Sequence, residues 1–75
     1  MTAVCINEVR VDSVAIRLLE REHPHFPAWL STDYVMVATD ARQPRAAGMA
    51  FLGYDVTEAK KRFDRAVEIA AREVT

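Results

Sequence analysis

The 75-residue chain contains one cysteine, Cys5, and two glycines, Gly48 and Gly53. An intramolecular disulfide is excluded because it needs two cysteines. A glycine-rich phosphate-binding loop is excluded because it needs several closely spaced glycines. A chain of this length forms one domain, here residues 1–75, whose core contributes only about 3–5 kcal/mol of net stability. Since 51% of the residues are hydrophobic, we expect self-association to supply further stability.

The chain also has little net charge and lacks long apolar runs. Ten basic and eleven acidic residues give a formal net charge of −1, which is not the electrostatic signature of a protein that binds nucleic acid or an anionic membrane. The apolar run YVMVA is far too short to span a bilayer, and the N-terminus does not resemble a secretion signal. We therefore expect a cytoplasmic protein without a membrane partner. Arginine outnumbers lysine and alanine is abundant, which indicates a bacterial or phage origin.

The strongest structural signal is the segment Val56–Val74. Its apolar residues recur at helical spacing and fall on one stripe, while Ile69 lies about 140° away from that stripe. Asp55 is placed to cap the N-terminus, with Glu58 three residues later as in a capping box. The segment therefore predicts a long helix that packs along one face.

Two apolar segments, DYVMVATD and AAGMAFLGYD, precede this helix and are separated by the polar segment ARQPR. Because Pro44 cannot lie in a central strand, the polar segment suits the loop of a β-hairpin spanning Tyr34–Tyr54. Both runs are apolar at successive positions. We therefore expect one face of the hairpin to contact the helix and the other to contact another element or a second chain.

The N-terminal part of the chain permits two arrangements. The segment AVCINEVRVD is typical of a strand, and residues 13–22 fit either a helix that Ser13 caps or a strand with alternating faces. We prefer the helix, ended by His23 before Pro24, which gives the order β-α-β-β-α. The alternative is a three-stranded antiparallel sheet followed by one helix, β-β-β-α. Both belong to the α+β class, a small antiparallel sheet built on the hairpin and packed by the C-terminal helix.

The segment EREHPHFPAWLSTD, Glu20–Asp33, contains both histidines and the only tryptophan. His23 and His25 are one residue apart, and none of the available Cys, Asp and Glu residues completes a familiar zinc-binding spacing with them. We predict no metal and no cofactor. Two prolines stiffen this connector, so we expect the histidines to face solvent and the apolar side chains to contact the core or a partner. These apolar residues are Phe26, Trp29 and Leu30.

Catalysis is not expected from this sequence. Cys5 lies in an apolar, strand-like segment, where a free cysteine usually behaves as a small buried hydrophobe. A nucleophile would need an adjacent base and a pocket with oxyanion donors, which a domain of this size rarely builds. We therefore predict a protein that is not an enzyme and has no catalytic residues.

Protein–protein binding is the class that remains. Aromatic and arginine side chains carry most of the energy of known interfaces, and the strand edge at Ala47–Leu52 is suited to pairing with the same strand of a second subunit. We therefore expect a small non-enzymatic interaction module, homodimeric and regulatory, with an unidentified protein partner. The predicted partner-binding residues are Phe26, Trp29, Met49, Phe51 and Ile69.

The alternative is a nucleic-acid-binding regulator. Arg42 and Arg45 lie in the predicted hairpin loop, and Lys61 and Arg65 lie on one side of the predicted helix. In this hypothesis a dimer places two arginine loops side by side, where they contact phosphates. In the interaction module the same two arginines supply polar specificity.

Overall fold

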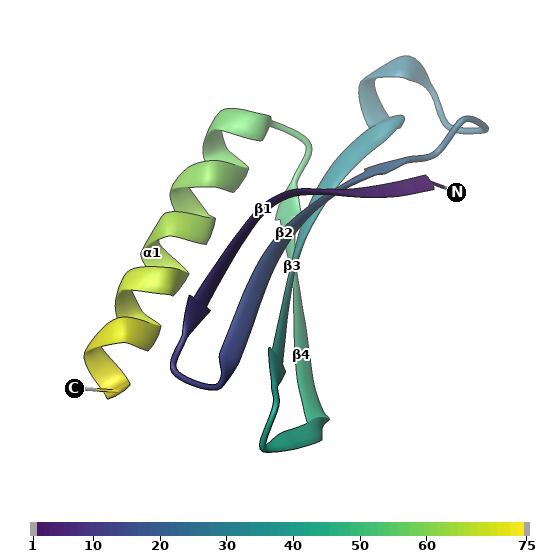
Figure 1. Ribbon diagram of the computed structural model, residues 1–75. Coiled ribbons are helices and arrows are strands. Elements are labelled where there is room, and N and C mark those ends of the chain that lie inside the picture. Colours follow the sequence, from purple (N-terminus) through teal and green to yellow (C-terminus); the bar gives the residue numbers. More distant parts are fainter. Residues whose placement is uncertain (1, 75) are drawn as a thin grey trace.

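The computed structural model describes residues 2–74, apart from the side chains of Pro44, Ala46, Ala47 and Val74. Four strands are followed by one long helix (Figure 1). Their bounds are β1 Thr2–Val11, β2 Val14–Glu22, β3 Thr32–Asp40, β4 Gln43–Gly53 and α1 Val56–Val74, with a short 3₁₀ turn, η1, at Ala28–Leu30. The strands pair antiparallel in the order β1-β2-β3-β4, and α1 packs on one face of this sheet.

The predicted α+β class, with an antiparallel sheet packed by a C-terminal helix, is confirmed. The preferred helix over residues 13–22 is wrong, because this segment forms β2, and the three-stranded alternative was one strand short. A tight turn at Asp12 and Ser13 explains the difference. Asp12 adopts a left-handed φ of 56°, which aspartate tolerates better than most residues. The Ser13 hydroxyl donates to Asp40 Oδ1 at 2.8 Å instead of capping a helix.

The predicted hairpin is formed by β3 and β4, but its turn is shorter than expected. Only Ala41 and Arg42 separate the two strands, so Gln43, Pro44 and Arg45 belong to β4. β4 is an edge strand, where a proline without an N–H group is tolerated. Pro44 can therefore be part of β4 because β4 lies at the edge of the sheet.

The helix has the predicted bounds. Asp55 Oδ1 accepts a hydrogen bond from the Thr57 backbone N–H at 3.0 Å, which satisfies one of the unpaired amides at the helix start. Glu58 lies 3.6 Å from Lys61 Nζ. The sequence therefore locates the cap and both ends of α1.

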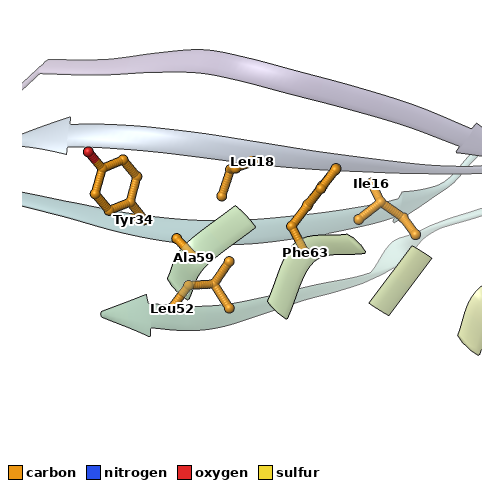
Figure 2. Packing of buried hydrophobic residues seen from close by; sticks show 6 residues of the cluster. All are labelled: Ile16, Leu18, Tyr34, Leu52, Ala59 and Phe63. Atoms are coloured by element: carbon orange, nitrogen blue, oxygen red, sulfur yellow. The ribbon is translucent and has the colours of Figure 1, made fainter. Parts of the chain in front are cut away.

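The hydrophobic core lies between the sheet and the first half of α1 (Figure 2). Leu18 on β2 and Phe63 on α1 are fully buried, and their neighbours in Figure 2 come from three strands and the helix. The cluster consists of Ile16, Leu18, Tyr34, Leu52, Ala59 and Phe63. Toward its C-terminus α1 carries apolar residues that are only half-buried, such as Ala66 and Ala70, so the helix closes tightly on the sheet at one end only.

Candidate interaction site

The face of the sheet opposite α1, called the open face here, carries an apolar patch on β3 and β4. Alternation places Val35, Val37, Met49 and Phe51 on this face, and the strand register pairs Val35 with Phe51 and Val37 with Met49. Val35 is only 2% exposed, whereas Met49 is 71% and Phe51 is 52% exposed. The patch therefore has a buried centre and a prominent apolar rim along the edge strand.

Tyr54 extends this patch at the end of β4. Its ring packs edge-on against Phe51, with 5.4 Å between the ring centroids and 73° between the planes, a geometry that aromatic pairs prefer. Sequence reasoning did not include Tyr54 among the partner-binding residues. Its position one residue after a strand that exposes Phe51 was the available signal.

The β1–β2 part of the open face is charged. Glu8 Oε1 lies 3.5 Å from Arg10 Nε and 3.6 Å from Arg17 Nε. Such exposed ion pairs add little stability, but they separate the open face into a charged half and an apolar half. A partner of mainly apolar surface therefore fits the β3–β4 half.

A buried carboxylate, Asp33, anchors the connector between β2 and β3. Arg21 lies directly opposite on β2 and donates from Nε to Asp33 Oδ1 at 2.8 Å and from Nη2 to Oδ2 at 2.9 Å. His23 Nε2 also lies 2.9 Å from Asp33 Oδ2. The hydrogen bonds from Arg21 lower the pKa of Asp33, burial opposes this, and the His23 contact lowers it further. Asp33 is therefore held charged and fixed in place.

The prediction that both histidines face solvent is wrong for His23, whose side chain is only 15% exposed. Its ring stacks on Phe26 with 5.0 Å between centroids, while His25 is exposed. Among residues 2–74, no group of three His, Cys, Asp or Glu side chains lies close enough to hold a metal ion. The His23–Asp33 pair therefore acts as a structural clamp on the connector.

The connector presents its apolar side chains outward. Trp29 in η1 is 75% exposed and Phe26 is 54% exposed, so neither belongs to the core. Figure 1 shows the connector projecting beyond one end of the sheet. Of the two places that the sequence left open for these rings, the core is excluded.

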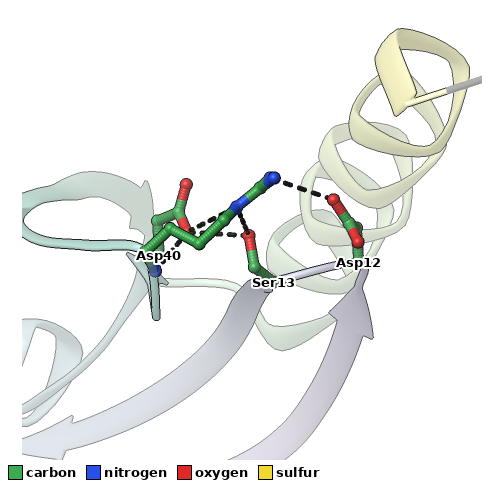
Figure 3. A network of polar contacts seen from close by, with 4 residues as sticks. Asp12, Ser13 and Asp40 are labelled. Atoms are coloured by element: carbon green, nitrogen blue, oxygen red, sulfur yellow. Dashed lines mark hydrogen bonds and ion pairs between the residues drawn. The ribbon is translucent and has the colours of Figure 1, made fainter.

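The turns at the other end of the sheet form a polar network (Figure 3). Arg42 Nε donates to Ser13 Oγ at 2.8 Å, and Arg42 Nη2 donates to Asp12 Oδ2 at 3.0 Å. The Arg42 backbone N–H donates to Asp40 Oδ1 at 2.9 Å, and this bond, followed by the one from Ser13, lowers the pKa of Asp40. The Arg42 side chain thus links the β3–β4 turn to the β1–β2 turn, and its guanidinium group is occupied by these contacts.

The four basic residues of the nucleic-acid hypothesis are distributed over three elements. Arg42 lies in the β3–β4 turn and Arg45 on β4. Lys61 and Arg65 flank the buried Phe63 at two residues on either side, so helical geometry directs them away from the sheet. Lys61 and Arg65 therefore share one surface of α1, whereas Arg42 and Arg45 lie on other elements.

An apolar groove of about 430 Å³ lies between the C-terminal half of α1 and the sheet. Its sheet side comes from β1, β2 and β3, and includes Val14, Ile16 and Met36. Ile69 lines the helix side and is 45% exposed. The predicted contact residue Ile69 is thus part of this groove and lies on the opposite face from Met49 and Phe51.

Two further features correct or add to the sequence prediction. Cys5 is exposed on β1, with its thiol donating to the Asn7 carbonyl oxygen at 3.3 Å, so it is not the buried hydrophobe expected. The Arg21–Asp33 pair was missed because the two residues are twelve apart in sequence and meet only through the β2–β3 register.

No family model matches the chain, and no curated protein or solved structure matches it either. Within residues 2–74, no helix combines the length and the apolar character needed to cross a bilayer.

Proposed function

We propose that the chain is a small, non-enzymatic interaction module that works as a homodimer, with the apolar β3–β4 half of the open face as its main contact surface. The observation that carries the proposal is the exposure of Met49 and Phe51 beside the buried Val35. Burying such a side chain stabilises a complex by roughly 1.5–3 kcal/mol. Two copies of each are available in a symmetric dimer.

The second part of the proposal concerns a different protein partner. Phe26 and Trp29 project from a connector that Asp33 clamps, so they are held in place before binding and lose little conformational freedom on contact. Aromatic anchors on a rigid element are typical of interface hot spots. We assign them to a regulatory partner protein, with Ile69 in the helix–sheet groove as a further contact.

The cellular location forms part of the same proposal. Cys5 is exposed and unbridged, which suits a reducing compartment because exposed thiols oxidise readily elsewhere. We therefore place the protein in the cytoplasm, without a membrane partner.

Light scattering on a size-exclusion column tests the proposal. The untagged protein is expected to elute as a dimer at micromolar concentration. The double variant Met49→Lys/Phe51→Lys is expected to elute as a folded monomer. The control Val4→Lys, which changes another exposed apolar side chain on β1, is expected to remain dimeric. The assignment would be overturned if the wild-type protein were monomeric at a concentration on the order of 100 μM, or if the double variant remained dimeric.

Nucleic-acid binding is the second candidate function, and one observation favours it. Arg45 is exposed and has no ion-pair partner among residues 2–74, so its charge is available to a phosphate. A phosphate binder loses affinity steeply between about 50 and 200 mM salt, and Arg42→Ala/Arg45→Ala is expected to abolish such binding while leaving the dimer intact. A wild-type protein that does not bind nucleic acid at about 50 mM salt would remove this candidate, and retention of binding in that variant would exclude these two arginines as the contact residues.

A further inference from the structure

The two edges of the sheet differ in how they are protected against pairing with another strand. β1 and β4 are the edge strands, and each has outward backbone groups that another strand can satisfy. β1 has an irregularity between Cys5 and Asn7 and exposes the charges of Glu8 and Arg10, which are common protections of an edge. Both edges have an uncharged part without proline, residues 2–7 of β1 and 48–52 of β4. The part in β1 contains the irregularity, whereas residues 48–51 of β4 pair regularly with β3, so this part of β4 is the more open edge.

We propose that β4 of a second copy adds to this edge in an antiparallel register centred on Ala50, which joins the two four-stranded sheets into one. This inference rests on the proposed homodimer and specifies its contact. An antiparallel edge can pair with itself about a two-fold axis, so the same strand supplies both sides of the interface. The regular part of β4, Gly48–Phe51, lies around the proposed axis.

The register follows from the side chains of the open face. With Ala50 on the axis, Met49 lies opposite Phe51 of the second copy, and Phe51 lies opposite the second copy's Met49. Both residues are on the open face and are more than half exposed. Contacts between a methionine sulfur and an aromatic ring are favourable, and cross-strand pairs of this kind stabilise sheets.

A cysteine scan tests the register. In a Cys5→Ser background, Ala50→Cys is expected to form an intermolecular disulfide on mild oxidation, giving a species of twice the 8.5 kDa monomer mass. Residues directly opposite on antiparallel strands have Cα atoms about 4.5–5.5 Å apart, which is within the span of a disulfide. Gly48→Cys is the matched control, because its Cβ meets no atom within 4 Å in the monomer but lies far from its own counterpart in the dimer.

The outcomes separate the register from the homodimer itself. A native mass spectrum of reduced Ala50→Cys protein that shows a dimer, combined with no disulfide at position 50, would overturn the β4 interface and leave the homodimer proposal standing. A monomer would overturn both. Ala50→Lys is expected to weaken the dimer by about tenfold, since it places two like charges opposite one another on adjacent strands, where they repel, whereas Arg65→Asp on α1 is expected to have no effect. Equal dissociation constants for these two variants would contradict the register.

Discussion

Replacement of Asp33 by asparagine is expected to destabilise the domain strongly. Asp33 is 5% exposed and receives two hydrogen bonds from Arg21, with His23 close to its second oxygen. Hydrogen bonds to charged groups contribute roughly 1.5–3 kcal/mol each, and removing one partner leaves the other unsatisfied. An asparagine keeps the shape but accepts at only one atom and directs an NH₂ group at Arg21. Because Arg21 remains partly accessible to water, we expect a loss of about 2–3 kcal/mol.

This loss is large for so small a domain. A 75-residue protein has a free energy of unfolding of roughly 4–11 kcal/mol, and 1 kcal/mol shifts the Tm of a domain of this size by about 4–8 °C. Asp33→Asn is therefore expected to lower the Tm by about 10–20 °C at neutral pH, measured by circular dichroism at fixed protein concentration. The control Asp64→Asn, on the exposed side of α1, is expected to change stability by less than about 0.5 kcal/mol.

The pH dependence of the same variant gives an independent check. Since the pKa of Asp33 is lower in the folded state than in the unfolded chain, its stabilisation is fully present above the unfolded pKa of about 4. This stabilisation is lost as the pH falls through the folded value. The Tm difference between wild type and Asp33→Asn is therefore constant above about pH 5 and shrinks below pH 4. A variant that melts within about 3 °C of wild type, or a Tm difference that stays constant into acid, would refute the reasoning.

Three further substitutions test the packing. Phe63→Ala is expected to unfold the domain at 25 °C, because the ring is fully buried and such truncations cost about 3–5 kcal/mol, whereas Phe63→Leu is expected to keep the far-ultraviolet circular dichroism spectrum of the fold. Trp29→Ala is expected to leave the Tm within about 3 °C because the ring is 75% exposed; a larger drop would show that the ring packs on the connector. Arg42→Ala is expected to lower the free energy of urea unfolding by about 1 kcal/mol, since its hydrogen bonds to Ser13 and Asp12 in the β1–β2 turn are lost. The control Arg45→Ala is expected to match wild type, and an equal effect of the two would contradict this role of Arg42.

The helix was predictable because its pattern is local. Its apolar stripe repeats over several turns, and Asp55 marks its start, so hydrophobic spacing and capping agree. The preferred helix over residues 13–22 failed for the opposite reason. β2 has a neighbouring strand on each edge, and Ala15 on the open face is buried as well as Ile16 and Leu18 on the face that α1 covers. A strand that is apolar on both faces does not alternate, and its apolar residues then fit a helical stripe equally well.

The candidate sites were predictable only in part, because their geometry depends on register. Met49 and Phe51 are two residues apart, so their common face follows once β4 is read as a strand. Arg21 and Asp33 meet because β2 and β3 pair in one register, and reading residues 13–22 as a helix removed that pairing. The exposure of Trp29 depends on where the connector projects, which local sequence does not encode.

The proposed β4 interface also bears on the nucleic-acid hypothesis, which requires the two arginine turns of a dimer to lie side by side. Arg42 precedes Ala50 by eight residues, and an antiparallel pairing centred on Ala50 carries the two turns in opposite directions. At about 3.3 Å per residue they lie roughly 50 Å apart, which is too far for both to contact one short stretch of phosphates. The Ala50→Cys disulfide dimer therefore tests both ideas. If this dimer binds a short duplex no more tightly per chain than the reduced protein does, the two arginine turns act separately. If it binds more tightly, and Arg42→Ala removes the gain, then the two turns lie closer than the antiparallel register allows, and the β4 strands joined at position 50 must meet in another orientation.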